Sequence, residues 1–123
     1  MTKTVTKHEQ AEVGHTRAEF EERFALFMDA LTAYINECDK EFLEKFNKIY
    51  RVVSYERGIK FICIVVTHPE GGQRSVYCFL DYQGNIYKAA SWRSPAKHIR
   101  GSIFEDHFSI GRALGSYGAA YLR

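Results

Sequence analysis

The sequence predicts an α+β fold in which one long amphipathic N-terminal helix packs on a four-stranded antiparallel β-meander. Two changes of pattern support this prediction. An apolar residue recurs every three or four positions from Phe20 to Ile49, which is the period of one helix face. From Tyr50 the period changes to two, and turn-forming residues then interrupt the chain repeatedly. The 123 residues are enough to bury a core without a metal or a disulfide.

The N-terminal part divides into an arm and a helix. Residues 1–15 are polar and aperiodic, so we expect a disordered arm there, followed by a single domain over residues 16–123. Thr16-Arg17-Ala18-Glu19 has the pattern of a capping box, which predicts a helix start. A helix from Arg17 to about Asn47 would be longer than a domain of this size needs. We therefore expect either a break near Asn36–Asp39 or a free end that packs on a second subunit.

The apolar stripe of this helix is predicted to face the core. It comprises Phe20, Phe24, Phe27, Met28, Leu31, Ile35, Cys38, Phe42, Phe46 and Ile49. Strands are predicted over residues 51–55, 59–68, 75–81 and 86–90. The second of these is apolar on both faces, which favours a central position in the sheet.

The C-terminal region is predicted to be irregular and rich in Gly and Tyr. Ser94-Pro95 is expected to end regular strand pairing. Glycines weaken a short helix over His107–Leu114, and Gly118–Arg123 is expected to be a strand or an ordered arm.

The cysteines and the hydropathy indicate a reducing compartment. Cys38, Cys63 and Cys78 are odd in number, widely spaced and set in apolar patterns, which is typical of buried structural thiols. A contact between Cys63 and Cys78 across neighbouring strands stays open, but we expect no disulfide. Residues 1–15 contain no secretory apolar segment, and the longest apolar run, residues 61–66, is too short to span a membrane. We therefore expect a cytoplasmic protein with no membrane partner.

Positive charge concentrates in the second half of the chain. Residues 1–50 have ten acids and seven Lys or Arg, whereas residues 51–123 have five acids and ten Lys or Arg. From Tyr82 to Phe104 there is no acid at all, and this stretch holds the only tryptophan. Fixed cations around an indole suit phosphates and stacked bases. The predicted nucleic-acid-binding residues are Lys88, Trp92, Arg93, Lys97, His98 and Arg100.

The expected geometry of this segment follows from the strand prediction. Lys88 and Trp92 should be anchored at the end of the fourth strand, whereas Arg93 to Arg100 should lie on a mobile loop. The alternative is that Trp92 closes the core and the charges form a solvated loop.

No pattern of an enzyme or a metal site is present in the sequence. The five histidines lack the close pairing with His or Cys that zinc sites use. No nucleophile stands in a local signature, and Gly111–Gly118 lacks the Lys-Ser/Thr ending of a phosphate loop. We therefore expect no catalytic residue, no metal, no cofactor and no enzymatic activity.

The segment Gly84–Phe104, which reads GNIYKAASWRSPAKHIRGSIF, resembles a segment of small uncharacterised proteins of tailed phages. The resemblance implies a viral accessory protein in the cytoplasm of an infected bacterium, and it transfers no functional residue. Together, the residues and the resemblance favour a non-enzymatic accessory protein that binds nucleic acid. The alternative is an oligomeric structural or interaction protein, with a dimer favoured, that binds no nucleic acid.

Overall fold

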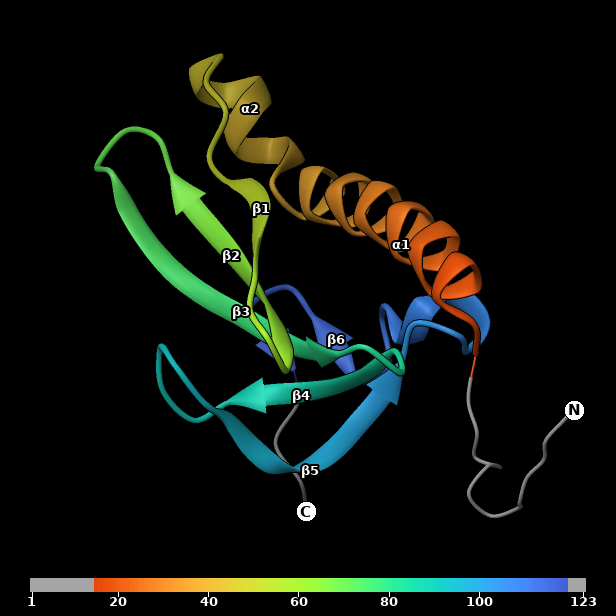
Figure 1. Ribbon diagram of the computed structural model, residues 1–123. Helices are drawn as coiled ribbons and strands as arrows, with labels where there is room; N and C mark the ends of the chain where they lie inside the picture. The colour runs from red at the N-terminus through yellow and green to blue at the C-terminus, as the bar shows by residue number, and fades with distance from the viewer. Residues whose placement is uncertain (1–14, 120–123) are drawn as a thin grey trace, which may run out of the picture.

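The computed structural model describes residues 15–119 and shows an α+β fold (Figure 1). Two helices are followed by a five-stranded sheet, a short 3₁₀ turn and a two-stranded hairpin. The helices are α1 (Arg17–Cys38) and α2 (Lys40–Phe46). The strands of the large sheet are β1 (Val52–Arg57), β2 (Phe61–His68), β3 (Gln73–Asp81), β4 (Asn85–Ala89) and β5 (Pro95–Ser102). The remaining elements are η1 (Asp106–Ser109), β6 (Leu114–Gly115) and β7 (Gly118–Ala119).

The large sheet is an antiparallel meander with the strand order β1-β2-β3-β4-β5. The prediction of antiparallel strands in sequence order is confirmed, and β2 has a partner on each side as expected. The predicted number of four strands is wrong, because Pro95–Ser102 forms a fifth strand. Pro95 is the first residue of an edge strand, where a missing backbone N–H breaks no ladder.

Helix α1 begins as the sequence predicts. The Thr16 side chain accepts a hydrogen bond from the Glu19 backbone, and the Glu19 carboxylate accepts one from the Thr16 backbone. Further along α1, Arg23 donates hydrogen bonds to the backbone oxygens of Ile103 and Glu105, which attaches the helix to the segment after β5. The buried residues of α1 are Phe20, Phe24, Phe27, Leu31 and Ile35.

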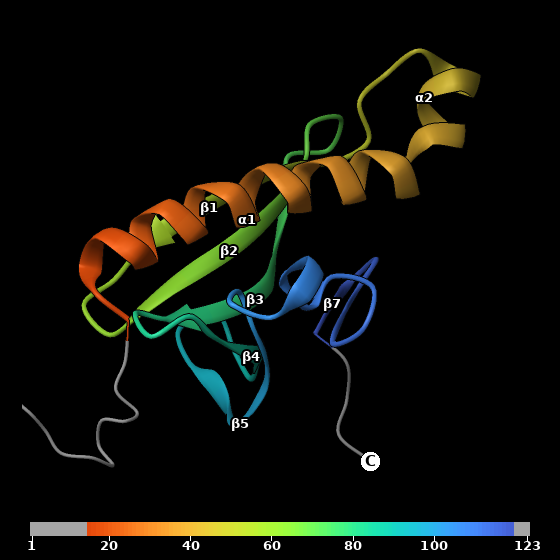
Figure 2. The ribbon, with the colours of Figure 1, turned by 90° about the vertical axis from the view of Figure 1, so that its right-hand side faces the viewer.

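The predicted break in the long helix is confirmed at Asp39. After it, α2 has no buried residue, and it stands beyond the C-terminal end of α1 in Figures 1 and 2. The prediction that the whole stripe faces the core is therefore wrong for its last third: Phe46 and Ile49 are exposed. Cys38 at the end of α1 is also exposed, which corrects its assignment as a buried thiol.

A buried ion pair between Arg51 and Asp39 stabilises the break between α1 and α2. The Arg51 guanidinium, only 4% exposed, donates two hydrogen bonds to the Asp39 carboxylate at 2.9 and 2.6 Å. It also donates to the Ser116 backbone oxygen at 2.6 Å and to the Ser116 hydroxyl at 3.1 Å. Arg51 thus joins the end of α1, the start of the sheet and the C-terminal hairpin.

The C-terminal region is ordered by tight turns instead of a helix. The short helix over His107–Leu114, which the glycines were expected to weaken, does not form: Asp106–Ser109 is a single turn whose last three residues have positive φ. The hairpin β6–β7 then packs on β3, where Tyr77 donates a hydrogen bond to the Gly115 oxygen. A Cβ at Gly118 would lie 2.6 Å from the Tyr77 oxygen, so only glycine fits there.

Two sequence predictions fall largely or partly outside the described residues. The predicted N-terminal arm is residues 1–15, of which only His15 is described; its ring stacks on that of Phe104. Of the predicted C-terminal strand or arm, Gly118–Ala119 forms β7, and residues 120–123 lie outside the described residues.

The two faces of the large sheet differ in what covers them. Figure 2 shows α1 lying along the sheet, with the β4–β5 hairpin extending away from the helix. The face that packs on α1, η1 and the β6–β7 hairpin is here called the covered face. Its sheet residues are Val53, Ile62, Ile64, Val66, Tyr77, Cys78, Leu80 and Ile86. Tyr77 and Cys78 are neighbours in β3 and share this face because the register between β2 and β3 shifts there. The opposite face carries no described helix and is here called the open face.

Strand alternation separates two of the cysteines. Cys63 pairs with Phe79, and Ile64 pairs with Cys78. Successive side chains of a strand point to opposite faces, so Cys63 lies on the open face and Cys78 on the covered face. The two thiols therefore lie on opposite faces of the sheet, and all three cysteines are free.

Candidate nucleic-acid interface

The open face carries a small cluster that is rich in aromatic side chains. It consists of Phe61, Cys63, Val65, Val76, Phe79, Tyr87 and Ala89. The Phe61 ring makes edge contacts with Phe79 and Tyr87, at centroid distances of 6.2 and 5.6 Å. Edge-to-face packing of this kind fixes the orientation of the rings. The open face thus contains a packed apolar cluster in which Cys63, Val65 and Phe79 are themselves buried.

Hydrogen bonding and burial also set the chemistry of this cluster. Tyr87 donates a hydrogen bond of 2.8 Å to the Asp81 carboxylate, and burial together with this bond raises the pKa of Tyr87 to about 12. Burial likewise raises the pKa of the Cys63 thiol. Both groups therefore stay protonated and uncharged near neutral pH.

The turn between β4 and β5 is closed by two serines. The backbone N–H groups of Ala90 and Ser91 both donate to the Ser94 oxygen, at 3.0 and 3.1 Å, and the Ser91 and Ser94 hydroxyls are 2.9 Å apart. Trp92 and Arg93 lie between these serines. A short, hydrogen-bonded turn holds both residues at the end of the hairpin. The prediction of an irregular loop over Arg93 to Arg100 is wrong, because Pro95–Ser102 forms β5.

The Trp92 indole is 48% exposed and does not close the core. The guanidinium carbon of Arg74 lies 5.5 Å from the centroid of the indole, a cation–π distance. Arg74 in turn forms an ion pair of 2.6 Å with Glu56 on β1. The indole is therefore positioned by a chain of contacts that crosses the open face.

A groove lies between the β4–β5 turn and the β1–β2 turn. Its volume is about 560 Å³, which is within the range of about 300–1,000 Å³ typical of sites for small ligands. Phe61, Cys63 and Phe79 contribute its apolar lining. The lining residues from the β1–β2 side are Glu56, Arg57, Gly58, Ile59 and Lys60, and those from the β4–β5 side are Trp92, Arg93, Ser94 and Pro95.

The charges around this groove are mostly positive. Arg57 is neutralised by Glu21, and Arg74 by Glu56. Lys60 and Arg93 are exposed and form no ion pair within residues 15–119. One such cation therefore stands on each side of an apolar groove.

The structure brings together only part of the predicted site. Trp92 and Arg93 line the groove. Lys97 and His98 are exposed on β5, where its pairing with β4 shifts register.

The other two predicted residues lie differently. Lys88 is half-buried and stands between Tyr87 and Ala89, so alternation directs its side chain away from the open face. Arg100 is half-buried and donates a hydrogen bond of 2.7 Å to the His98 oxygen. Of the six predicted residues, only Trp92 and Arg93 line the groove.

The sequence interpretation missed the opposite wall of the groove. Lys60 and Ile59 belong to the β1–β2 turn, and Ile59 is 98% exposed. The sequence prediction placed Ile59 inside a strand, whereas the structure begins that strand at Phe61. The available signal was the position of Ile59 between Gly58 and Lys60, which indicates a turn residue and not a strand residue.

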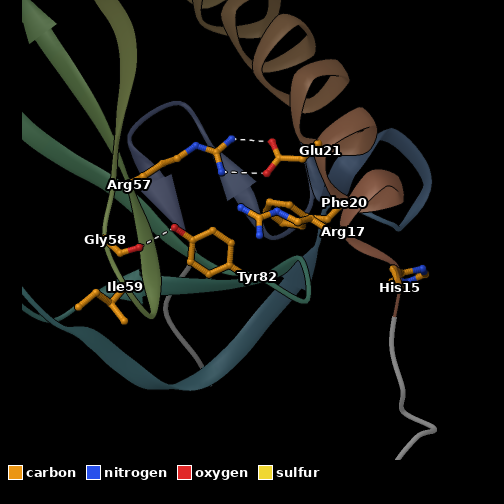
Figure 3. Close-up of a pocket in the computed structure, with 8 residues that line it drawn as sticks. All are labelled: His15, Arg17, Phe20, Glu21, Arg57, Gly58, Ile59 and Tyr82. Atoms are coloured by element: carbon orange, nitrogen blue, oxygen red, sulfur yellow. Dashed lines mark hydrogen bonds and ion pairs between the residues drawn. The ribbon is translucent and has the colours of Figure 1, made fainter. Parts of the chain in front are cut away.

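A second cavity of about 500 Å³ lies on the other side of the β1–β2 turn (Figure 3). Figure 3 shows Arg57 forming two hydrogen bonds to Glu21, at 3.0 and 2.7 Å, and Tyr82 donating one of 2.6 Å to the Gly58 oxygen. The guanidinium of Arg57 and the hydroxyl of Tyr82 thus already have hydrogen-bond partners within the protein. These hydrogen bonds therefore hold the β1–β2 turn against α1 and against Tyr82, which follows β3.

Among the described residues, Ser109 is the one serine that combines a buried hydroxyl with a hydrogen bond to a carboxylate. Catalytic serines have a similar arrangement with a base. The Ser109 hydroxyl donates to the Glu105 carboxylate at 2.5 Å and accepts from the Ser102 backbone at 3.0 Å. Ser109 is 1% exposed, so no substrate reaches it. Its bonds instead close the turn after β5. Within residues 15–119, no three His, Cys, Asp or Glu side chains come close enough to hold a metal ion.

Comparison with known proteins gives a family and no function. None of the helices in the described part of the chain is long and apolar enough to cross a membrane. No curated protein and no solved structure matches the chain. The model of a family of unknown function, DUF7717, matches residues 2–111, which is most of the chain. The chain therefore belongs to the DUF7717 family.

Proposed function

We propose that this protein is a non-enzymatic accessory protein that binds single-stranded nucleic acid through the open face of its sheet. The observation that carries the proposal is the position of Trp92, half-exposed at the end of a hydrogen-bonded turn and beside Arg93. Indole rings bind bases by stacking, and arginines bind phosphates through paired N–H groups. Lys60 across the groove supplies a second cation.

The outer strand of the hairpin extends this positive surface. Lys97 and His98 are exposed on β5 next to the turn that holds Arg93. They would contact phosphates that lie beyond the groove. The resemblance of Gly84–Phe104 to small proteins of tailed phages adds a viral setting to the proposal.

The test is fluorescence anisotropy with a labelled single-stranded oligonucleotide. The wild type should bind, and its affinity should fall steeply as salt increases, because phosphate contacts release counterions. The double variant Trp92→Ala/Arg93→Ala should bind at least about tenfold more weakly, since one stacked base alone contributes about 1–3 kcal/mol.

Arg112→Ala is the matched control for the loss of charge. Arg112 is exposed but lies after η1, away from the open face, so this variant should bind like the wild type. Absence of salt-sensitive binding by the wild type, or equal losses in Arg93→Ala and Arg112→Ala, would contradict the proposal.

The second candidate is an oligomeric interaction protein with no nucleic-acid partner, and α2 favours it. Leu43, Phe46 and Ile49 are about half-exposed and close together in the chain, and no residue of α2 is buried. Exposed apolar patches of this kind often mark interfaces between subunits. Light scattering after size exclusion should then give the mass of a dimer for the wild type and of a monomer for Phe46→Glu. A wild type that is monomeric at all concentrations would eliminate this candidate.

A further inference from the structure

We infer that the groove on the open face accepts one unstacked base of a single strand, whose backbone crosses the face from Lys60 to Arg93. This inference rests on the proposed function and specifies what is bound. The groove has one wall on the β1–β2 turn, which carries Lys60, and one on the β4–β5 turn, which carries Arg93. The cations stand on different hairpins, on opposite sides of the apolar lining. A strand held by both must cross the groove instead of running along it.

The lining indicates what enters the groove. Phe61 and Phe79 are ring neighbours at its apolar surface, and the Cys63 thiol lies beside them, kept neutral by the raised pKa of this buried group. A phosphate would lose its hydration there without gaining a partner. A base has flat apolar faces and loses little. The charges therefore hold the phosphates at the rims, and the base points inward.

Trp92 supplies the stacking surface. One side of its environment is occupied by Arg74, whose guanidinium is in turn held by Glu56. Because the indole is half-exposed and also lines the groove, a base that enters can stack on it. Trp92 and Arg93 are adjacent in the chain, so the stacked base and the phosphate next to it are recognised by neighbouring residues.

This geometry excludes an intact duplex from the groove. The faces of paired bases are covered by their neighbours, and a base would have to be flipped out at a considerable cost. A single strand already presents unstacked bases. Only two phosphates are held at the groove itself: Lys60 and Arg93 together should contribute about −1.4 to the slope of log affinity against log salt, or about −0.7 for each phosphate.

The experiment compares three probes of about 12 nucleotides on the unmodified protein: single-stranded oligothymidine, an abasic strand with the same phosphates, and the oligothymidine–oligoadenine duplex. The base-bearing strand should bind at least about fivefold more tightly than either other probe, which is the lower limit for one stacked base. Equal binding of the base-bearing and abasic strands would overturn the inference and leave the proposed function standing. Binding of none of the three would overturn both.

A groove-filling variant tests the location. Cys63→Phe places a ring at the lining and should remove the preference for the base-bearing strand, while Arg93 and Lys60 keep the weaker binding to phosphates. Cys38→Phe makes the same change at an exposed site outside the groove and should retain the preference. Retention of the preference by a folded Cys63→Phe would overturn the assignment to this groove. The abasic comparison decides the inference even if that variant does not fold.

Discussion

The two faces of the sheet differ in what buries their side chains. On the covered face, Phe27, Leu31 and Ile35 of α1 are completely buried against the sheet. On the open face, Cys63, Val65 and Phe79 are buried against Phe61, Val76, Tyr87 and Ala89 of the same face, and no described helix covers them. The covered face therefore carries most of the stabilising burial. The open face carries the groove to which we assign the proposed ligand, and no described helix covers it.

The largest expected difference concerns the aromatic side chains. Phe27→Ala should reduce the free energy of unfolding by about 3–5 kcal/mol, because it leaves a cavity in a fully buried region. Phe61→Ala removes a half-buried ring on the open face and should cost no more than about 2 kcal/mol. Urea denaturation of both variants measures the two values, and equal losses would show that the open face is also a closed core.

The next difference concerns two ion pairs. Arg51→Met removes a buried guanidinium that bonds Asp39 and Ser116, and it should cost about 3 kcal/mol because a partly buried carboxylate loses its partner. Arg74→Met breaks an exposed pair with Glu56 on the open face and should cost no more than about 1 kcal/mol.

These two variants make the same chemical change on the two sides of the sheet. Thermal unfolding followed by circular dichroism measures both, and the two transitions should differ clearly in midpoint. Arg51→Lys keeps the charge but loses the paired geometry, so its stability should lie between those of the wild type and Arg51→Met. A cost for Arg74→Met as large as that for Arg51→Met would contradict the difference between the faces.

The smallest expected effect is in thiol reactivity. Burial raises the pKa of both Cys63 and Cys78, which lowers their thiolate fraction at any given pH. Exposed Cys38 should therefore react first with iodoacetamide, then Cys63 through the groove, and Cys78 only when the protein unfolds. Raising the pH should increase the rate at Cys63 up to its elevated pKa. Mass spectrometry of peptides measures the order, and alkylation of Cys78 before Cys63 would contradict it.

Local patterns in the sequence predicted most of the fold. Thr16 and Glu19 define the start of α1 through bonds between residues three apart, and the change of period at Tyr50 defines the start of the sheet. The fifth strand could not be predicted in this way. Pro95 disfavours pairing in general, and it is accepted here because its position at the start of an edge strand depends on the neighbouring β4.

The candidate site was predicted less completely for a related reason. The sequence identified Trp92 and Arg93 because they adjoin one another in a stretch without acids. It could not identify Lys60, which is distant in the chain and reaches the groove only through the pairing of successive strands. Nor could it separate Lys88 from Trp92, because strand alternation and burial decide which side chains share a face.

The position of the single tryptophan also has a spectroscopic consequence. Trp92 is half-exposed in the β4–β5 turn, far in sequence from the buried residues of α1. Its intrinsic emission therefore reports the opening of the hairpin instead of the melting of the core. If the hairpin opens before the rest of the domain, emission and ellipticity will trace separate transitions, and the wild-type chain will show local opening of the groove without any attached dye.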